Sequence, residues 1–96
     1  MKTISRYLHT HGYLTKGKEA HHWNYNLPYS VIIISRTSHK LLHKFMRVDY
    51  NDKHCYKLNG ERLESEKQAI DYFKSCLLSN GIHENIKVLN LKQMLL

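Results

Sequence analysis

The chain has 96 residues, with 15 Lys and Arg against 8 Asp and Glu, and a formal net charge of +7. A chain of this length buries one modest core, so we expect a single domain over residues 1–96 without accessory modules. The only cysteines, Cys55 and Cys76, form no CxxC pair, which argues against a disulfide framework and a cysteine zinc knuckle. We expect both thiols to be reduced and buried.

The apolar residues are too scattered to form a membrane span. The longest apolar run, residues 31–34, has four residues, and the N-terminus lacks the apolar stretch of a secretion signal. We therefore expect a soluble, intracellular protein that does not contact membranes. Its positive charge suits a polyanionic partner such as nucleic acid, with a merely solvated basic surface as the alternative.

The first half of the chain predicts two loops and a buried strand. Residues 1–20 show no clear period and are expected to form a loop, with one short strand at about 7–13. Residues 24–30 (NYNLPYS) contain the only proline and are expected to form a second loop. The β-branched run 31–34 (VIII) is typical of a short buried strand.

A helix is predicted over residues 36–48, with Ser35 as its N-cap. At 100° per residue its apolar side chains fall on one continuous face. His39 and His43 lie at the seam between that face and a basic stripe. The apolar face comprises Leu41, Leu42, Phe45, Met46 and Val48, and the basic stripe comprises Arg36, Lys40, Lys44 and Arg47.

The second half of the chain predicts a hairpin and a second helix. The stretch HCYKL-NG-ERL has the pattern of a hairpin that turns at Asn59-Gly60. Ser65 opens a capping-box pattern for a structural helix, which Asn80-Gly81 would end. The apolar tail, residues 86–96 (IKVLNLKQMLL), fits either a strand or a helix.

Four histidines carry the chemistry that the sequence suggests. The i, i+4 spacing of His39 and His43 places two imidazoles about one turn apart on a helix face, as chelation of one metal ion requires. A third nitrogen ligand must come from elsewhere. The adjacent pair His21 and His22 is the obvious source, because a reversal through the 24–30 loop can bring it beside the helix.

The adjacent pair offers more than a ligand. Neighbouring residues on an extended segment point to opposite sides, so one His can bind the metal while the other faces a substrate as a free base. Hydrolysis of a phosphodiester needs both a metal ion at the phosphate and a base of near-neutral pKa to activate water.

The central segment combines these features in one order: HHWNYN at residues 21–26, a loop containing Pro28, the strand 31–34, and His39-x-x-x-His43 on a helix. It resembles the HNH (ββα-metal, His-Me finger) endonuclease family, most closely short phage proteins of the homing-endonuclease type. The resemblance covers the central quarter of the chain strongly and extends loosely to about residue 75.

The resemblance implies an α+β fold with a ββα-metal core at about 15–48 and an added hairpin and helix at about 53–96. It assigns His21, His39 and His43 as ligands of one divalent metal ion and His22 as the general base. Mg²⁺ or Mn²⁺ is then expected for activity, while the all-His ligand set also suits Zn²⁺ or Ni²⁺.

The implied activity is that of a DNA endonuclease that nicks one strand. By the same resemblance, the protein belongs to a phage or mobile element and acts in the cytoplasm of a bacterial host. Its partner would be DNA, and recognition of a long target site would need a homodimer or a partner protein.

Ser30 departs from the family pattern. The family usually places Asn nine residues before the first helical His, where its side chain braces the loop that carries the ligand and the base. The shorter Ser30 side chain either braces that loop less firmly or leaves the bracing to Asn26 or Asn24. Ser30 and Asn26 are therefore candidates for supporting the catalytic base.

Basic side chains near the histidines are candidates for phosphate contacts. They are Arg36, Lys40, Lys44 and Arg47 of the predicted helix, together with Lys16 and Lys18 before the His pair. Trp23 is expected to be an apolar plug under the loop rather than a stacking surface for a base. No role is assigned to the remaining histidines, which are His9, His11, His54 and His83.

Two other functions fit the same residues. A domain of this fold that has lost turnover would bind DNA or interfere with other nucleases, and Ser30 in place of Asn favours that alternative. A structural zinc protein would use all four histidines to close a tetrahedral site, and a chelator would then unfold it.

Overall fold

The computed structural model describes residues 17–90, and these residues form an α+β fold. Within that range lie two helices and two antiparallel sheets. The strand expected at about 7–13 lies outside the described residues. In chain order the elements are β1 (Lys18–His22), β2 (Ser30–Ser35), α2 (Arg36–Leu42), β3 (Met46–Asp49), β4 (His54–Lys57), α3 (Glu66–Ser79) and β5 (Lys87–Asn90).

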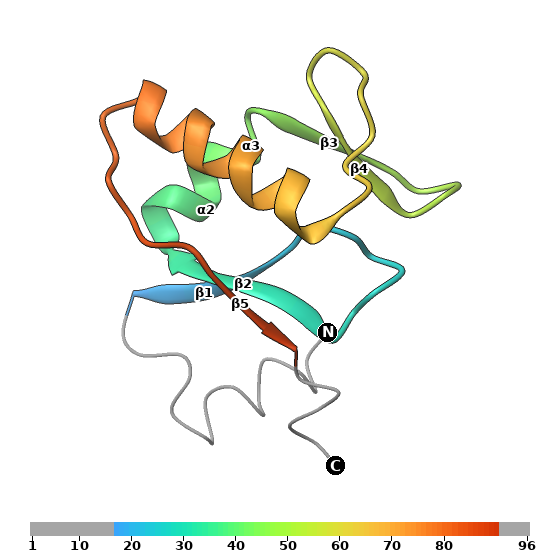
Figure 1. Ribbon diagram of the computed structural model, residues 1–96, viewed down its shortest axis with the longest axis horizontal. Coiled ribbons are helices and arrows are strands. Elements are labelled where there is room, and N and C mark those ends of the chain that lie inside the picture. Colours follow the sequence, from blue (N-terminus) through green and yellow to red (C-terminus); the bar gives the residue numbers. More distant parts are fainter. Residues whose placement is uncertain (1–16, 91–96) are drawn as a thin grey trace.

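The larger sheet has the strand order β1-β2-β5. Its central strand, β2, carries the predicted β-branched run, which suits a pleated and buried surface. β1 pairs antiparallel with it, so that His21 lies opposite Ile32 and His22 opposite Val31. β1 begins at Lys18, inside the stretch expected to be a loop, because pairing with β2 extends the chain there. Figure 1 shows α2 and α3 on the same side of this sheet.

α2 begins where the sequence predicts and ends six residues early. Ser35 caps it, since its side chain accepts a hydrogen bond from the backbone N–H of Ser38. The prediction of a helix over 36–48 is wrong, because α2 ends at Leu42 and the chain then enters β3. Val48 pairs with Cys55 of β4, and this non-local ladder competes with the helical period that the sequence shows.

The predicted hairpin is only partly present. Gly60 adopts a positive φ of 92° and Asn59 accepts a hydrogen bond from the N–H of Glu61, so the chain does turn there. Beyond the turn, however, only an isolated bridge joins Tyr56 to Arg62. The main partner of β4 is β3, and the two strands form the second sheet.

The second helix agrees with the prediction at both ends. The Ser65 side chain caps α3 by accepting from the N–H of Gln68, and Asn80 is the C-cap. Gly81 follows with a positive φ of 77°, a conformation that favours glycine. Neither described helix is long and apolar enough to cross a membrane. The tail, which the sequence left open, contributes β5 on the free edge of β2.

One apolar cluster joins the helices to both sheets. Trp23 is buried in it, as expected of a plug under the loop. Cys55 is also buried and Cys76 is half-buried, and both are free thiols. The cluster consists of Trp23, Ile32, Ile34, Leu42, Met46, Cys55, Leu63, Ala69, Phe73 and Leu77.

Candidate metal centre

Three imidazoles from β1 and α2 meet above the larger sheet. They belong to His21 on β1, His39 on α2 and His43, the C-cap of α2. One nitrogen of each ring lies within 4.8 Å of the others, and among residues 17–90 this is the group that could hold a metal ion. The ring centroid of His21 lies 4.9 Å from that of His39 and 5.1 Å from that of His43. The structure thus brings together the three predicted ligands.

His21 has a buried nitrogen without a partner. The side chain is 1% exposed, and its ring packs edge-on against Phe73. Its Nε2 accepts or donates no hydrogen bond within the described part of the chain. Burial, and then the nearby imidazoles, lower the pKa of His21 to about 3, so the ring is neutral at pH 7. A neutral imidazole with an unsatisfied buried nitrogen is what a metal ligand requires.

His39 is oriented by Glu19. The Nδ1 atom of His39 lies 3.0 Å from Oε1 of Glu19, and because a carboxylate accepts, Nδ1 carries the proton. Nε2 is then left with its lone pair toward the other imidazoles. The hydrogen bond from His39 also lowers the pKa of Glu19. A carboxylate behind a ligating histidine fixes its tautomer and raises its basicity.

His43 completes the group. Its Nε2 lies 3.0 Å from Nε2 of His39. Two nitrogens bound to one tetrahedral zinc ion are roughly 3.3 Å apart, so a small movement of either ring would accommodate an ion. Burial and the neighbouring His39 lower the pKa of His43, which favours the neutral form that binds metal.

His22 is held apart from the three imidazoles. Its Nε2 lies 3.0 Å from the carbonyl oxygen of Pro28, which can only accept, so Nε2 carries the proton and Nδ1 keeps a lone pair. The ring stacks on Tyr25 at a centroid distance of 5.1 Å. Burial lowers the pKa of His22, although the bond to Pro28 partly offsets this, so the ring is neutral at pH 7. Strand alternation explains why His21 and His22 diverge.

Ser30 and Asn26 brace other parts of the loop. The hydroxyl of Ser30 accepts a hydrogen bond of 2.9 Å from Nε1 of Trp23, the residue after His22. The side-chain amide of Asn26 donates to the backbone carbonyl of Asp52, which ties the loop to the β3–β4 turn. Both contacts stabilise the loop, and neither of them reaches His22 directly.

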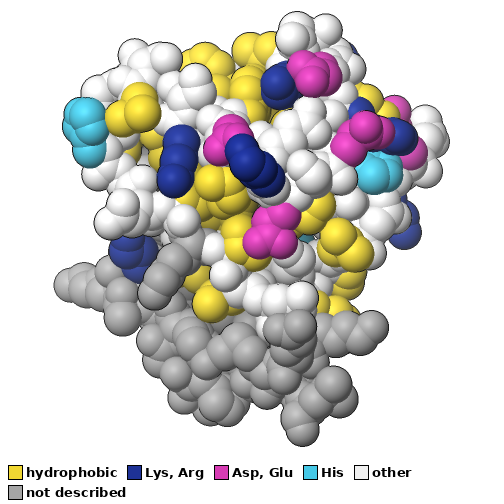
Figure 2. All heavy atoms as spheres, viewed as in Figure 1, with side chains coloured by type: hydrophobic (Ala, Val, Ile, Leu, Met, Phe, Trp, Pro, Cys, Tyr) yellow, Lys and Arg dark blue, Asp and Glu magenta, His cyan; other side chains and the backbone are white. Residues whose placement is uncertain are grey.

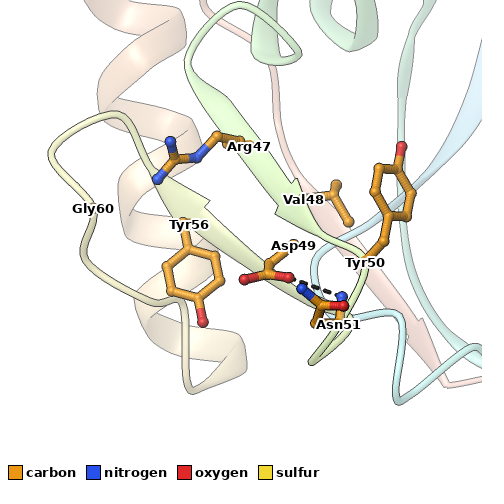
Figure 3. Close-up of a pocket in the computed structure, with 7 residues that line it drawn as sticks. All are labelled: Arg47, Val48, Asp49, Tyr50, Asn51, Tyr56 and Gly60. Atoms are coloured by element: carbon orange, nitrogen blue, oxygen red, sulfur yellow. Dashed lines mark hydrogen bonds between the residues drawn. The ribbon is translucent and has the colours of Figure 1, made fainter.

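The predicted basic stripe is divided by the early end of α2. Arg36, Lys40 and Lys44 line one groove, together with Asn80 and Ile82. Arg47 lies instead on β3 and lines a separate pocket, to which Tyr50 and Tyr56 also contribute (Figure 3). The expectation that all four side chains share one helix face is therefore wrong.

Lys16 and Lys18, the two lysines before the His pair, were also predicted to contact phosphate. Lys18 forms an ion pair of 3.2 Å with Glu84, so its charge is already matched. Lys16 lies outside the described residues. On the face shown in Figure 2, basic and acidic side chains lie next to one another rather than in a patch of one sign. Lys67 and Asp71 of α3 form an ion pair of 3.0 Å.

Two carboxylates beside the site, those of Glu19 and Glu84, were not predicted from the sequence. Glu19 could have been found, because it stands two residues before His21 and the same side of a strand recurs every second residue. Glu84, whose carboxylate contacts both β1 and α2, has no comparable local signal. It approaches them only because β5 returns to the sheet.

Comparison with known proteins gives no support for assigning a family. No model of a protein family matches the chain, and neither the curated proteins nor the solved structures give a significant match.

Proposed function

We propose that this protein is a metal-dependent DNA endonuclease of the ββα-metal type. In this proposal one divalent ion is bound by His21, His39 and His43, and His22 is the general base. Mg²⁺ or Mn²⁺ would support activity, and Zn²⁺ or Ni²⁺ would also suit three imidazole ligands.

The observation that carries the proposal is the separation of the four histidines into three and one. Structural zinc sites are closed by four protein ligands, whereas catalytic sites have three and keep a position open for water or substrate. Three imidazoles lie together here, and the fourth, His22, is engaged by Pro28 and Tyr25 instead. This division favours an open catalytic site over a structural zinc site.

The chemistry follows from the protonation states. When bound, the ion would supply Lewis-acid stabilisation of the charge that develops on the scissile phosphate. His22 would take a proton from water through Nδ1, and the water oxygen would form a bond to phosphorus as the bond to the leaving oxygen breaks. The hydrogen bond between Nε2 and Pro28 would stabilise the protonated ring that results.

Nicking of supercoiled plasmid tests the proposal. Wild type, His22→Ala and His83→Ala would be assayed in Mg²⁺, Mn²⁺, Ni²⁺ and Zn²⁺, where His83 is an exposed control histidine outside the site. We expect His22→Ala to lose at least ~100-fold in rate, since general bases contribute about that much or more, and His83→Ala to stay within about twofold. A wild-type rate in His22→Ala would refute the role of His22.

A second function, DNA binding without turnover, is favoured by one contact. Ser30 is engaged with Trp23 and gives no direct support to His22, so the proposed base is oriented by the Pro28 carbonyl and by stacking on Tyr25, without a bracing side-chain hydrogen bond from Ser30. A pure binder would retard DNA in a gel without breaking it in any of the four metals. A nuclease would convert the plasmid to the nicked form in at least one.

A further inference from the structure

The carboxylate of Glu84 is held by two other elements. Its Oε1 accepts hydrogen bonds from the hydroxyls of Ser35 at 2.8 Å and Ser38 at 2.5 Å. Its Oε2 accepts from the backbone N–H of Ser35 at 2.7 Å and pairs with Nζ of Lys18 at 3.2 Å. The side chain is 13% exposed, so these charge-assisted bonds are shielded from water. This is a connected polar cluster rather than a surface ion pair.

The elements that Glu84 joins are the two that carry the three imidazoles. Lys18 begins β1, three residues before His21, and Ser38 immediately precedes His39 on α2. A single carboxylate therefore connects the strand that supplies one ligand to the helix that supplies the others.

α2 depends on such contacts for its position. It has seven residues, and isolated helices shorter than about 12 residues are marginal in water. Its two buried residues are Ser38 and Leu42. Leu42 fixes the C-terminal end in the apolar core, and the contact of Ser38 with Glu84 fixes the N-terminal end. His39 lies between these two anchors.

Glu84 is itself fixed to the same framework. Ile82 and Ile86 flank it and pack against the apolar cluster. β5 begins at Lys87, whose backbone pairs opposite Ile33 of β2. The carboxylate is thus attached through β5 to the sheet that contains β1.

We propose that Glu84 is a positioning residue that sets the distance between β1 and α2 and so closes the three-imidazole group around a metal ion. This inference rests on the metal centre of the proposed function. Metal ligands must be placed within fractions of an ångström, and supporting hydrogen bonds typically contribute 10–100-fold to metal affinity.

The ionisation of Glu84 agrees with this role. Partial burial raises its pKa, but the hydrogen bonds from Ser38 and Ser35 and the contact with Lys18 outweigh burial and hold the pKa at about 2. The Glu84 carboxylate is therefore charged throughout the pH range in which imidazoles bind metal.

The test is the metal affinity of Glu84→Gln, with Glu61→Gln as the control. Glu61 is an exposed carboxylate that pairs with Lys57, away from the three imidazoles. Zn²⁺ affinity would be measured by competition with a chromophoric chelator, ligand geometry by the visible absorption of bound Co²⁺, and folding by circular dichroism. We expect Glu84→Gln to weaken Zn²⁺ binding at least ~10-fold and to change the Co²⁺ spectrum while folded. Glu61→Gln should change neither.

The outcomes separate the two proposals. Wild-type affinity and an unchanged Co²⁺ spectrum in folded Glu84→Gln would overturn the role of Glu84 alone. Absence of metal binding in the wild type would overturn the metal centre and the role of Glu84 with it. If Glu84→Gln does not fold, Ser38→Ala is the second variant, because it removes the hydroxyl that donates to Glu84 and contacts Ser35 but leaves the carboxylate in place. It should weaken Zn²⁺ binding several-fold. Wild-type binding by Ser38→Ala would then overturn the inference.

Discussion

Each ring nitrogen of His39 has a partner in the structure. Nδ1 faces Glu19 and Nε2 faces His43, so its tautomer is determined by contacts that the structure shows. His22 is constrained in a similar way by the carbonyl of Pro28, which leaves the lone pair on Nδ1, the atom that we propose as the base. At the scale of single residues, the candidate site depends on the four imidazoles and equally on the contacts that orient them, namely Glu19 with His39 and Pro28 with His22.

Replacing Glu19 tests the orientation of His39. In Glu19→Gln the amide no longer favours a proton on Nδ1, so we expect the affinity for Zn²⁺ to fall about 10- to 100-fold. Chelator competition measures the effect. Glu64→Gln is a matched control, since Glu64 is an exposed carboxylate that pairs with Arg62. Equal losses in both variants would mean that net charge, rather than the contact with His39, determines affinity.

The residues of the candidate site were largely predictable from the sequence, and their supports were not. The spacing of His39 and His43 places them on one face of any helix, and the adjacency of His21 and His22 separates them on any strand. The roles of Ser30 and Glu84 depend on contacts with Trp23 and with α2, which only the folded chain creates.

At the scale of elements, α2 is held by few side chains, and Leu42 is its main apolar anchor. Leu42→Ala should destabilise the protein by about 2–5 kcal/mol, because it leaves a cavity in a closed core. Leu58→Ala, at a leucine that is 62% exposed, should change stability by less than about 0.5 kcal/mol. Urea unfolding measures both, and similar values would show that α2 does not rely on this contact.

The contacts of the Glu84 carboxylate with Ser35, Ser38 and Lys18 should make the stability of the protein depend on pH. Folding lowers the pKa of Glu84 from 4.5 to about 2. The resulting stabilisation is complete above pH 4.5 and is lost as the pH falls toward 2. We expect Glu84→Gln to be less stable than wild type at pH 7 by on the order of 1–2 kcal/mol, and the difference to shrink below pH 4.5.

Urea unfolding of both proteins at a series of pH values measures that difference. A difference that stays constant down to pH 3 would show that the ionised carboxylate does not stabilise the fold.

Long-range strand pairing explains where the prediction of elements fails. Caps are local, so the starts of α2 and α3 at Ser35 and Ser65 agree with the sequence. The stretch Met46–Asp49 has an apolar period that fits a helix, yet it pairs with His54–Lys57 as β3 and β4. Which ladder a short segment joins depends on the partner that the whole fold supplies.

At the scale of the whole molecule, the net charge of +7 leaves some cations unmatched. Arg36 pairs with Glu19, whereas Lys40 and Lys44 form no ion pair within residues 17–90 and line the groove beside α2. In Lys44→Ala we expect weaker DNA binding and a salt dependence reduced by about one unit in the log–log slope. Binding titrations over a range of salt concentrations measure both quantities.

Lys67→Ala is the matched control for Lys44→Ala. Lys67 lies on α3 and pairs with Asp71, so its charge is already matched. A larger loss of affinity in Lys67→Ala than in Lys44→Ala would place the DNA on a different surface from the one beside the metal centre.

Metal stoichiometry decides whether three imidazoles bind one ion and His22 does not. Wild type, His22→Ala and His39→Ala would each be loaded with Zn²⁺, freed of excess metal and analysed for bound ion. We expect one ion per chain in wild type and His22→Ala, and clearly less than one in His39→Ala, because only two of the three imidazoles remain. A metal-free wild type, or equal losses in the two variants, would contradict this expectation.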